Sequence, residues 1–282
     1  MEIKNVTVIG AGTMGNGIAH VFAQNGFNVD FVDIKEEFVN KGLSTISKNI
    51  DRQIKKEIIT ENDKNDILKR ITPKIGIENI SNNTDLVIEA VTENKDIKLS
   101  IFNKLQDIVK EESIFASNTS SISITELANG SRPEKFIGMH FMNPVPVMKL
   151  VEIIRGYSTT DETYQTIKEL SEKLGKTPVE VQDYPGFISN RILMPMINEA
   201  IYTLYENVAS AEHIDTVMKL GMAHPMGPLT LADFIGLDVC LAIMNVLYDG
   251  FNDSKYRPCP LLKKMVAANK LGRKTGEGFF KY

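Results

Sequence analysis

The stretch Val6-Thr-Val-Ile-Gly10-Ala-Gly12-Thr-Met-Gly15 decides the fold of this 282-residue chain. Four residues typical of a β-strand run directly into the pattern G-x-G-x-x-G, and a helical pattern follows at once. Gly10 permits the tight turn out of the strand, Gly12 lets the backbone approach a pyrophosphate, and Gly15 allows close packing of helix on strand. The context therefore predicts the start of a β-α-β unit that binds a dinucleotide.

An acidic residue follows at the distance that a ribose-binding site requires. The first helix ends near Gly26, and a second strand at 27–32 leads to Asp33, 18 residues after Gly15. A carboxylate in this place accepts hydrogen bonds from the ribose hydroxyls of NAD and repels the 2′-phosphate of NADP, so we expect NAD as the cofactor. Lys35 lies close enough to leave the use of NADP open. The alternative is that the glycines serve only the geometry of the turn.

The composition is that of an ordinary globular protein and argues against several classes. Hydrophobic residues make up 43% of the chain and charged residues 24%, with a net charge of −4. This acidic balance gives no support for nucleic-acid binding, and no apolar run is long enough to span a bilayer. Cys240 and Cys259 suggest neither a metal cluster nor a disulfide framework. The first strand leaves no room for a signal peptide, and the cysteines form no metal-ligand cluster. We therefore expect a cytoplasmic protein without a metal.

Strands alternate with helices over the first part of the chain. Near-continuous apolar runs predict buried strands, and helical spacing of apolar residues predicts the segments between them. This alternation is typical of a doubly wound, mostly parallel α/β sheet, so we predict a Rossmann-like dinucleotide-binding domain over residues 1–184. The expected strands are 6–9, 27–32, 84–91, 113–116, 136–140, 150–154 and 178–182, with helical stretches at 36–70, 98–109 and 163–174.

The pattern changes after Tyr184-Pro185-Gly186. No convincing strand follows, and turn signals such as Gly227-Pro228 and Asp249-Gly250 separate apolar segments with helical spacing. We therefore predict an all-helical C-terminal domain over residues 185–282. Its expected helices are 188–204, 211–220, 229–247 and 261–268.

One histidine and one glutamate form the strongest candidate for acid–base chemistry. His140 ends a predicted strand, and Glu152 lies in the middle of the next one. If the two strands form a hairpin about Pro146, the two positions fall directly opposite each other and their side chains share a face. A carboxylate there would fix the imidazole tautomer and stabilise the protonated ring, as general acid–base catalysis requires. A purely structural ion pair fits the spacing equally well.

Other polar residues have two open interpretations each. Ser117-Asn-Thr-Ser-Ser121 follows a buried strand at the edge where open sheets bind ligands, but serine and threonine also cap helices. Glu93 and Lys98, at the same edge, would either contact the cofactor or open the next helix. Asn190, near the start of a long apolar helix, is typical of a cap.

A basic helix face is the best candidate for binding a large anionic substrate. Four cations recur at helical spacing within an otherwise acidic protein, which suits contact with phosphates. A solvated helix face is the alternative. The four are Lys48, Arg52, Lys55 and Lys56.

Taken together, the motifs resemble the L-3-hydroxyacyl-CoA dehydrogenases, and among them the short bacterial 3-hydroxybutyryl-CoA dehydrogenases. They occur in order and span essentially the whole chain, and the stretch from Gly138 to Glu152 is the most specific. The motifs lie at 10–15, 117–121, 138–152, 185–191, 224–228 and 272–279.

The resemblance implies an enzyme that interconverts (3S)-3-hydroxyacyl-CoA and 3-oxoacyl-CoA with NAD, with 3-hydroxybutyryl-CoA and acetoacetyl-CoA as the expected pair. It assigns His140 as the catalytic base, Glu152 as its acidic partner, and Ser120 and Asn190 as residues that hold the substrate oxygen. It also implies a homodimer formed through the helical domain. The cofactor contacts that it implies, beyond Gly10, Gly12 and Gly15, are Asp33, Glu93, Lys98 and Asn118.

The resemblance places a CoA-binding lysine at Lys56. Asn49 stands where some relatives carry a serine that contacts CoA, and Arg52 lies between the two on the same basic face. Two alternatives remain. A dehydrogenase of β-hydroxyacids or polyols without CoA would not need this face. A dinucleotide-binding protein without catalysis would have no reason to keep His140 and Glu152 in register.

Overall fold

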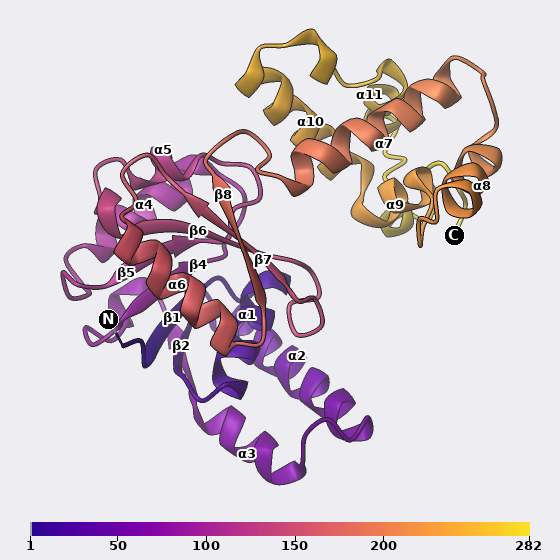
Figure 1. Cartoon of the computed structure of the whole chain (residues 1–282). Helices are drawn as coiled ribbons and strands as arrows, with labels where there is room; N and C mark the ends of the chain where they lie inside the picture. The colour runs from indigo at the N-terminus through magenta and orange to yellow at the C-terminus, as the bar shows by residue number, and fades with distance from the viewer. Residues whose placement is uncertain (1) are drawn as a thin grey trace. The chain divides into compact units, whose positions relative to one another are not determined.

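The computed structural model describes residues 2–282 and divides the chain into two compact units. The first unit runs to Asp183 and holds the sheet, and the second runs from Tyr184 to Tyr282 and is helical (Figure 1).

A single eight-stranded sheet organises the first unit of the described chain. Its strands are β1 (Asn5–Ile9), β2 (Asn28–Asp33), β3 (Ile71–Ile75), β4 (Leu86–Glu89), β5 (Ile114–Ser117), β6 (Phe136–Phe141), β7 (Leu150–Arg155) and β8 (Thr177–Gln182). They lie in the order β3-β2-β1-β4-β5-β6-β7-β8. All neighbours pair in parallel except β6 and β7, which are antiparallel. The predicted fold class, a doubly wound sheet followed by a helical region, is confirmed.

Helices cover both faces of the sheet (Figure 1). They are α1 (Thr13–Gln24), α2 (Glu36–Lys55), α3 (Glu61–Lys69), α4 (Lys95–Leu105), α5 (Ile124–Ala128) and α6 (Asp161–Lys173). Helices α1, α2, α3 and α6 share one core with alternate residues of the strands. On the other face Phe102 of α4 packs against Phe115 and Phe136, with ring centroids 5.5 and 4.6 Å apart. Burial of both faces explains why the central strands are almost continuously apolar.

Three features of this unit differ from what the sequence predicted. The helical stretch predicted at 36–70 forms two helices, α2 and α3, and a capping box of Thr60 and Asp63 starts the second. The strand β3 was missed, since it contains Pro73 and has mostly exposed residues. It pairs only with β2, and proline is tolerated on such an edge strand. The predicted helix 98–109 lies three to four residues further towards the N-terminus, as α4.

The second unit consists of α7 (Ser189–Tyr205), α8 (Ala211–Gly221), α9 (Pro228–Ile235), α10 (Leu237–Phe251) and α11 (Pro260–Ala267). Its core includes Met194, Ile201 and Leu247. The predicted single helix 229–247 is wrong, because the chain bends by 99° at Gly236, whose φ is +104°. Within residues 2–282 no single helix is both long and apolar enough to cross a bilayer, and α9 with α10 reaches that composition only across this bend.

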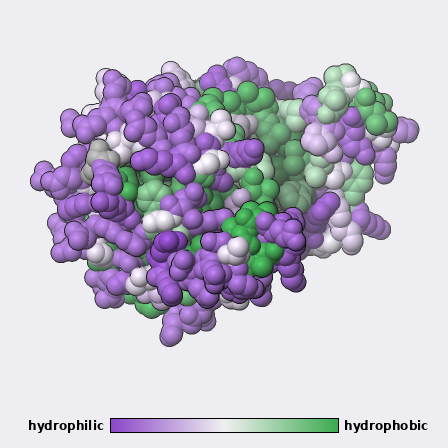
Figure 2. Space-filling view, turned by 60° about the horizontal axis from the view of Figure 1, so that its bottom comes forward, coloured by the Kyte–Doolittle hydropathy of each residue, from purple (hydrophilic) through white to green (hydrophobic). Residues whose placement is uncertain are grey.

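Hydrophilic side chains cover most of the face drawn in Figure 2, and apolar side chains gather in separate patches on it. A buried histidine on α1 lacks hydrogen-bond partners among the described residues. His20 is fully buried, and neither of its ring nitrogens has a hydrogen-bond partner among residues 2–282. Burial lowers the pKa of His20 from 6.5 to about 4, because the surroundings disfavour the charged ring.

We expect this histidine to make the fold sensitive to acid. Above about pH 6.5 the ring is neutral in both states, and below it only the unfolded chain takes up the proton, so stability falls until the pH reaches about 4. The difference between the two pKa values corresponds to about 3 kcal/mol. Urea unfolding of wild type and His20→Leu at about pH 7.5 and about pH 4 measures it. Wild type should lose about 3 kcal/mol more than the variant, and equal losses would contradict the assignment.

Candidate active site

The glycine motif has three different local roles. Gly10 has φ of +103°, and a Cβ there would lie 2.6 Å from the carbonyl oxygen of Ala90. A Cβ on Gly15 would lie 1.7 Å from the carbonyl oxygen of Gly10, so the first turn of α1 packs directly on the loop. A Cβ on Gly12 would meet nothing within 4 Å. The backbone at Gly12 is therefore open to a ligand, whereas the other two glycines are required by the fold.

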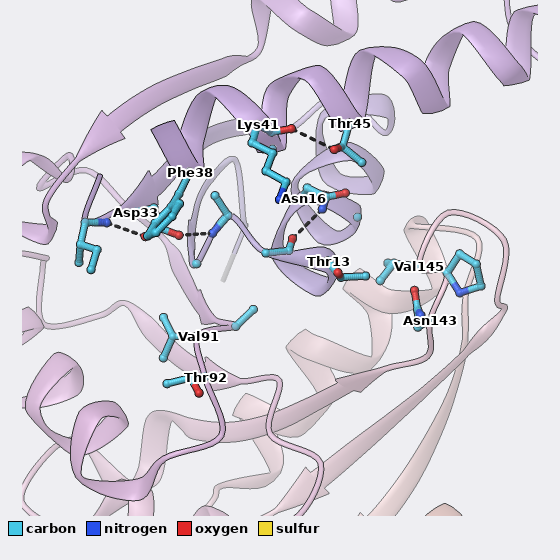
Figure 3. Close-up of a pocket in the computed structure, with 18 of the residues that line it drawn as sticks. Thr13, Asn16, Asp33, Phe38, Lys41, Thr45, Val91, Thr92, Asn143 and Val145 are labelled. Carbon is cyan, nitrogen blue, oxygen red and sulfur yellow. Dashed lines mark hydrogen bonds between the residues drawn. The ribbon is translucent and has the colours of Figure 1, made fainter. Parts of the chain in front are cut away.

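A cavity of about 680 Å³ opens over this loop. Figure 3 shows Asp33 and Phe38 at one end and Asn143 and Val145 at the other, with Val91 and Thr92 along one side. The cavity thus runs along the carboxyl edge of the sheet from the end of β2 to the loop after β6. Ligands of open α/β sheets bind at this edge.

Asp33 is held rigidly at its end of the cavity. Its Oδ2 accepts a hydrogen bond from the backbone N–H of Ala11 at 2.6 Å, and its Oδ1 accepts one from Ile34 at 2.7 Å. Each carboxylate oxygen has a further lone pair that a ribose hydroxyl can use. The neighbouring Lys35 lies over the ring of Phe38, with its Nζ 5.4 Å from the ring centroid. The open backbone at Gly12 and the carboxylate at Asp33 fit NAD.

Glu93 holds the loop of residues 119–121, which we call the Ser120 loop. Its Oε1 accepts hydrogen bonds from the backbone N–H of Ser120 and Ser121 at 2.9 and 3.0 Å and from the hydroxyl of Thr119 at 2.6 Å. Burial alone would raise the pKa of Glu93, but Lys98 and these donors lower it below its ordinary value. The capping alternatives for these residues are wrong, since Asn94 caps α4 and Ser123 caps α5.

Lys98 is buried between two carboxylates. Its side chain is 1% exposed, with Nζ 2.6 Å from Oε1 of Glu89 and 3.4 Å from Oε2 of Glu93. Burial raises the pKa of Glu89, and Lys98 opposes that effect. Glu89 was not found from the sequence, because it lies inside an apolar run. Glu93, Lys98 and Asn118 do not line the cavity that Gly10, Gly12 and Asp33 line, so any contact that they make with a cofactor remains a prediction.

His140 and Glu152 lie directly opposite each other in the antiparallel pair β6–β7, as the spacing about Pro146 predicted. Nδ1 of His140 is 2.7 Å from Oε2 of Glu152, and the two residues are 9% and 2% exposed. The next backbone N–H, of Phe141, donates to Oδ1 of Asn118 at 2.9 Å. Asn118 therefore ties the end of β5 to the end of β6, beside the histidine.

The basic face of α2 is exposed, and only part of the helix reaches the cavity. Asn49 lines the cavity and accepts a hydrogen bond from Arg52 at 3.1 Å, and Lys56 follows the last residue of the helix. Thr45 and Lys41, one and two turns before Asn49, also line the cavity. Neither residue was predicted from the sequence, although the same i, i+4 spacing points to them.

Asn190 belongs to the second unit, where it is the second residue of α7 and is 8% exposed. The N-cap position of this helix is Ile188, so the interpretation of Asn190 as a cap is wrong. No group of three or more histidine, cysteine, aspartate or glutamate side chains in residues 2–282 is arranged to hold a metal ion.

Comparison with known proteins agrees with this geometry. The model of the 3-hydroxyacyl-CoA dehydrogenase NAD-binding domain matches residues 5–184, and that of the C-terminal domain of the same family matches residues 186–282. The chain belongs to the 3-hydroxyacyl-CoA dehydrogenase family. The resemblance found in the sequence is thereby confirmed, and so is NAD as the cofactor.

Relatives within the 3-hydroxyacyl-CoA dehydrogenase family match along their full length. A probable 3-hydroxybutyryl-CoA dehydrogenase of Deinococcus radiodurans is 58% identical, over 98% of this chain and 99% of that protein. A 3-hydroxybutyryl-CoA dehydrogenase of Bradyrhizobium diazoefficiens is 56% identical, over 99% and 96%. The crystal structure of (S)-3-hydroxybutyryl-CoA dehydrogenase from Ralstonia eutropha has a TM-score of 0.97 at 54% identity, covering 100% and 99% of the two chains.

Two glycine variants separate cofactor binding from folding. Gly12 has φ of −68°, which alanine adopts freely, so Gly12→Ala should fold with a Tm within about 3 °C of wild type. Its methyl group would enter the cavity and weaken NADH binding by about tenfold or more, as titration of NADH fluorescence would measure. Gly15→Ala should instead lower the Tm, because its Cβ overlaps the Gly10 carbonyl. Unchanged NADH affinity in a folded Gly12→Ala protein would contradict the assigned cofactor site.

Proposed function

We propose that this protein interconverts (3S)-3-hydroxyacyl-CoA and 3-oxoacyl-CoA with NAD, with 3-hydroxybutyryl-CoA and acetoacetyl-CoA as its preferred pair and His140 as the catalytic base. The protein is an NAD-dependent oxidoreductase of the 3-hydroxyacyl-CoA dehydrogenase family. The names of its relatives support the four-carbon substrate.

The His140–Glu152 pair is the observation that carries the proposal. A nearly buried carboxylate is costly unless it is paired, and here its partner is a ring that can accept a proton. When Nδ1 engages Glu152, Nε2 is the nitrogen on the opposite edge of the ring. We assign Nε2 as the atom that takes the proton from the 3-hydroxyl group. Glu152 then stabilises the imidazolium that results.

When bound, NAD⁺ would supply the redox chemistry, as the acceptor of a hydride from C3 of the substrate. In our proposal Ser120 and Asn190 orient the reacting oxygen. Support for Ser120 comes from the Ser120 loop, which Glu93 holds through its backbone and side chains. In the reverse direction protonated His140 returns the proton to the 3-oxo group.

The basic face of α2 supports a substrate that carries CoA. We propose that Lys56, with Arg52 and Asn49, contacts the phosphates of CoA. Asn49 lines the cavity and is joined to Arg52 by a hydrogen bond, so a phosphate near Asn49 would lie within reach of a cation. The two cysteines are free and buried, which supports our proposal that the protein works in the reducing cytoplasm.

His140→Gln tests the assignment of the base. The glutamine amide can still donate a hydrogen bond to Glu152, so the fold should survive, but it cannot accept a proton at the substrate. We expect kcat for NADH oxidation with acetoacetyl-CoA to fall about a thousandfold. NADH affinity should stay within about twofold of wild type, because Gly12 and Asp33 are untouched. Turnover within a few-fold of wild type would show that another group is the base.

We also propose that the protein is a homodimer formed through its helical unit. Val208, Val217 and Leu220 of the helical unit are exposed by 71, 60 and 82%. An apolar cavity of about 480 Å³ lies between α7 and α8, with Val208 and Val217 in its wall. Exposed apolar surface of this kind is typical of a protein–protein interface.

A charge on this surface should disrupt the dimer. Val217→Asp places a carboxylate at the edge of the α7–α8 cavity, and we expect light scattering after size-exclusion chromatography to show the mass of a monomer at micromolar concentration. Tyr157→Asp is the matched control, because Tyr157 is 92% exposed but lies in the first unit. The proposal fails if wild type is itself monomeric or if both variants behave alike.

A further inference from the structure

We propose that Glu89, buried at the carboxyl end of β4, is a positioning residue that holds both the Ser120 loop and the wall of the cofactor cavity in place. The inference rests on the proposed function, in which Ser120 orients the reacting oxygen. It assigns a role to a residue that would touch neither substrate nor cofactor.

Glu89 receives three donors from three different elements. Its Oε1 accepts the backbone N–H of Val91 at 2.7 Å and the ammonium of Lys98 at 2.6 Å. Its Oε2 accepts the hydroxyl of Ser117 at 2.6 Å. An ionised carboxylate is an acceptor only, and this set of donors matches it. Glu89 is fully buried, so each lost contact would leave a buried polar group unpaired.

Two of these contacts lead to the Ser120 loop. Lys98, held by Glu89, also lies 3.4 Å from Glu93, and Glu93 accepts the backbone N–H groups of Ser120 and Ser121. Ser117, held by Glu89 from the other side, accepts the backbone N–H of Thr119 at 3.3 Å. The loop is therefore tied to one carboxylate through two short chains of polar contacts.

The third contact leads to the cofactor cavity. Val91 lies in the segment 90–92, all of which lines the cavity, and the carbonyl of Ala90 is the group that faces Gly10. The hydrogen bond from the Val91 N–H to Glu89 fixes this segment just beyond the strand. A single buried side chain thus sets the position of the cavity wall and of the Ser120 loop relative to each other.

The test is a double-mutant cycle on kcat for NADH oxidation with acetoacetyl-CoA. Glu89→Gln keeps the size of the side chain but removes the charge that holds Lys98 in place, so Lys98 should move towards Glu93 and pull it from the Ser120 loop. If Glu89 acts through Ser120, Glu89→Gln lowers kcat about tenfold in wild type and less than about threefold in a Ser120→Ala background.

Asp85→Asn is the matched control. Asp85 is a buried carboxylate at the opposite end of the same strand, where it pairs with Lys110 and accepts the backbone N–H groups of Lys4 and Asn5. It lies away from the cavity, so Asp85→Asn should lower the Tm while kcat stays within about twofold of wild type. Should Glu89→Gln fail to fold, Ser117→Ala removes one anchor of Glu89 and should lower kcat about threefold, again only where Ser120 is present.

The outcomes separate this inference from the function on which it rests. A kcat loss for Glu89→Gln that is the same with and without Ser120, or no loss at all, overturns the positioning role and leaves the proposed reaction intact. A normal kcat for Ser120→Ala alone overturns the role of Ser120 in the proposed function, and the inference with it.

Discussion

The antiparallel register of β6 and β7 is the constraint on which our proposed mechanism depends. Every other pair in the sheet is parallel, and only this hairpin places a histidine directly opposite a glutamate. Side chains of a strand alternate between faces, so a slip of one residue would move His140 and Glu152 to opposite faces of the sheet. The hairpin loop between them is itself fixed, because Lys176 donates to the carbonyls of Val145 and Met148 at 2.5 and 2.7 Å.

The parallel part of the sheet carries the loops that line the cofactor cavity. The strands β1, β4, β5 and β6 are consecutive neighbours, and their carboxyl ends carry the glycine loop, the segment 90–92, the Ser120 loop and His140 in that order. Buried polar contacts, rather than loop packing alone, join these ends. Glu89 spans β4 and β5, and Asn118 joins the end of β5 to that of β6. The side chains of Glu89 and Asn118 thus fix the carboxyl ends of neighbouring strands relative to one another.

Much of this could be predicted from the sequence, and the failures have physical causes. The glycine motif, Asp33 and the opposition of His140 and Glu152 follow from local geometry and strand periodicity. The break at Gly236 and the short strand with Pro73 depend on tertiary packing that overrides local pattern. The role of Glu89 could not be predicted, because a carboxylate inside an apolar strand needs a partner that local sequence does not show. That partner is Lys98, which the fold brings to it from α4. The interpretation of Asn190 as a cap failed because the N-cap position is two residues earlier, at Ile188, and the helix begins at Ser189.

The central claim is that the site acts on a thioester of CoA rather than on a free acid. The most direct measurement is NADH oxidation by wild-type protein with acetoacetyl-CoA and, in parallel, with acetoacetate at the same concentration. The account predicts that kcat/KM for acetoacetyl-CoA exceeds that for acetoacetate by about a thousandfold or more, because in our proposal only the CoA ester contacts the basic face of α2 as well as the proposed catalytic pair. Equal or faster turnover of free acetoacetate would contradict it.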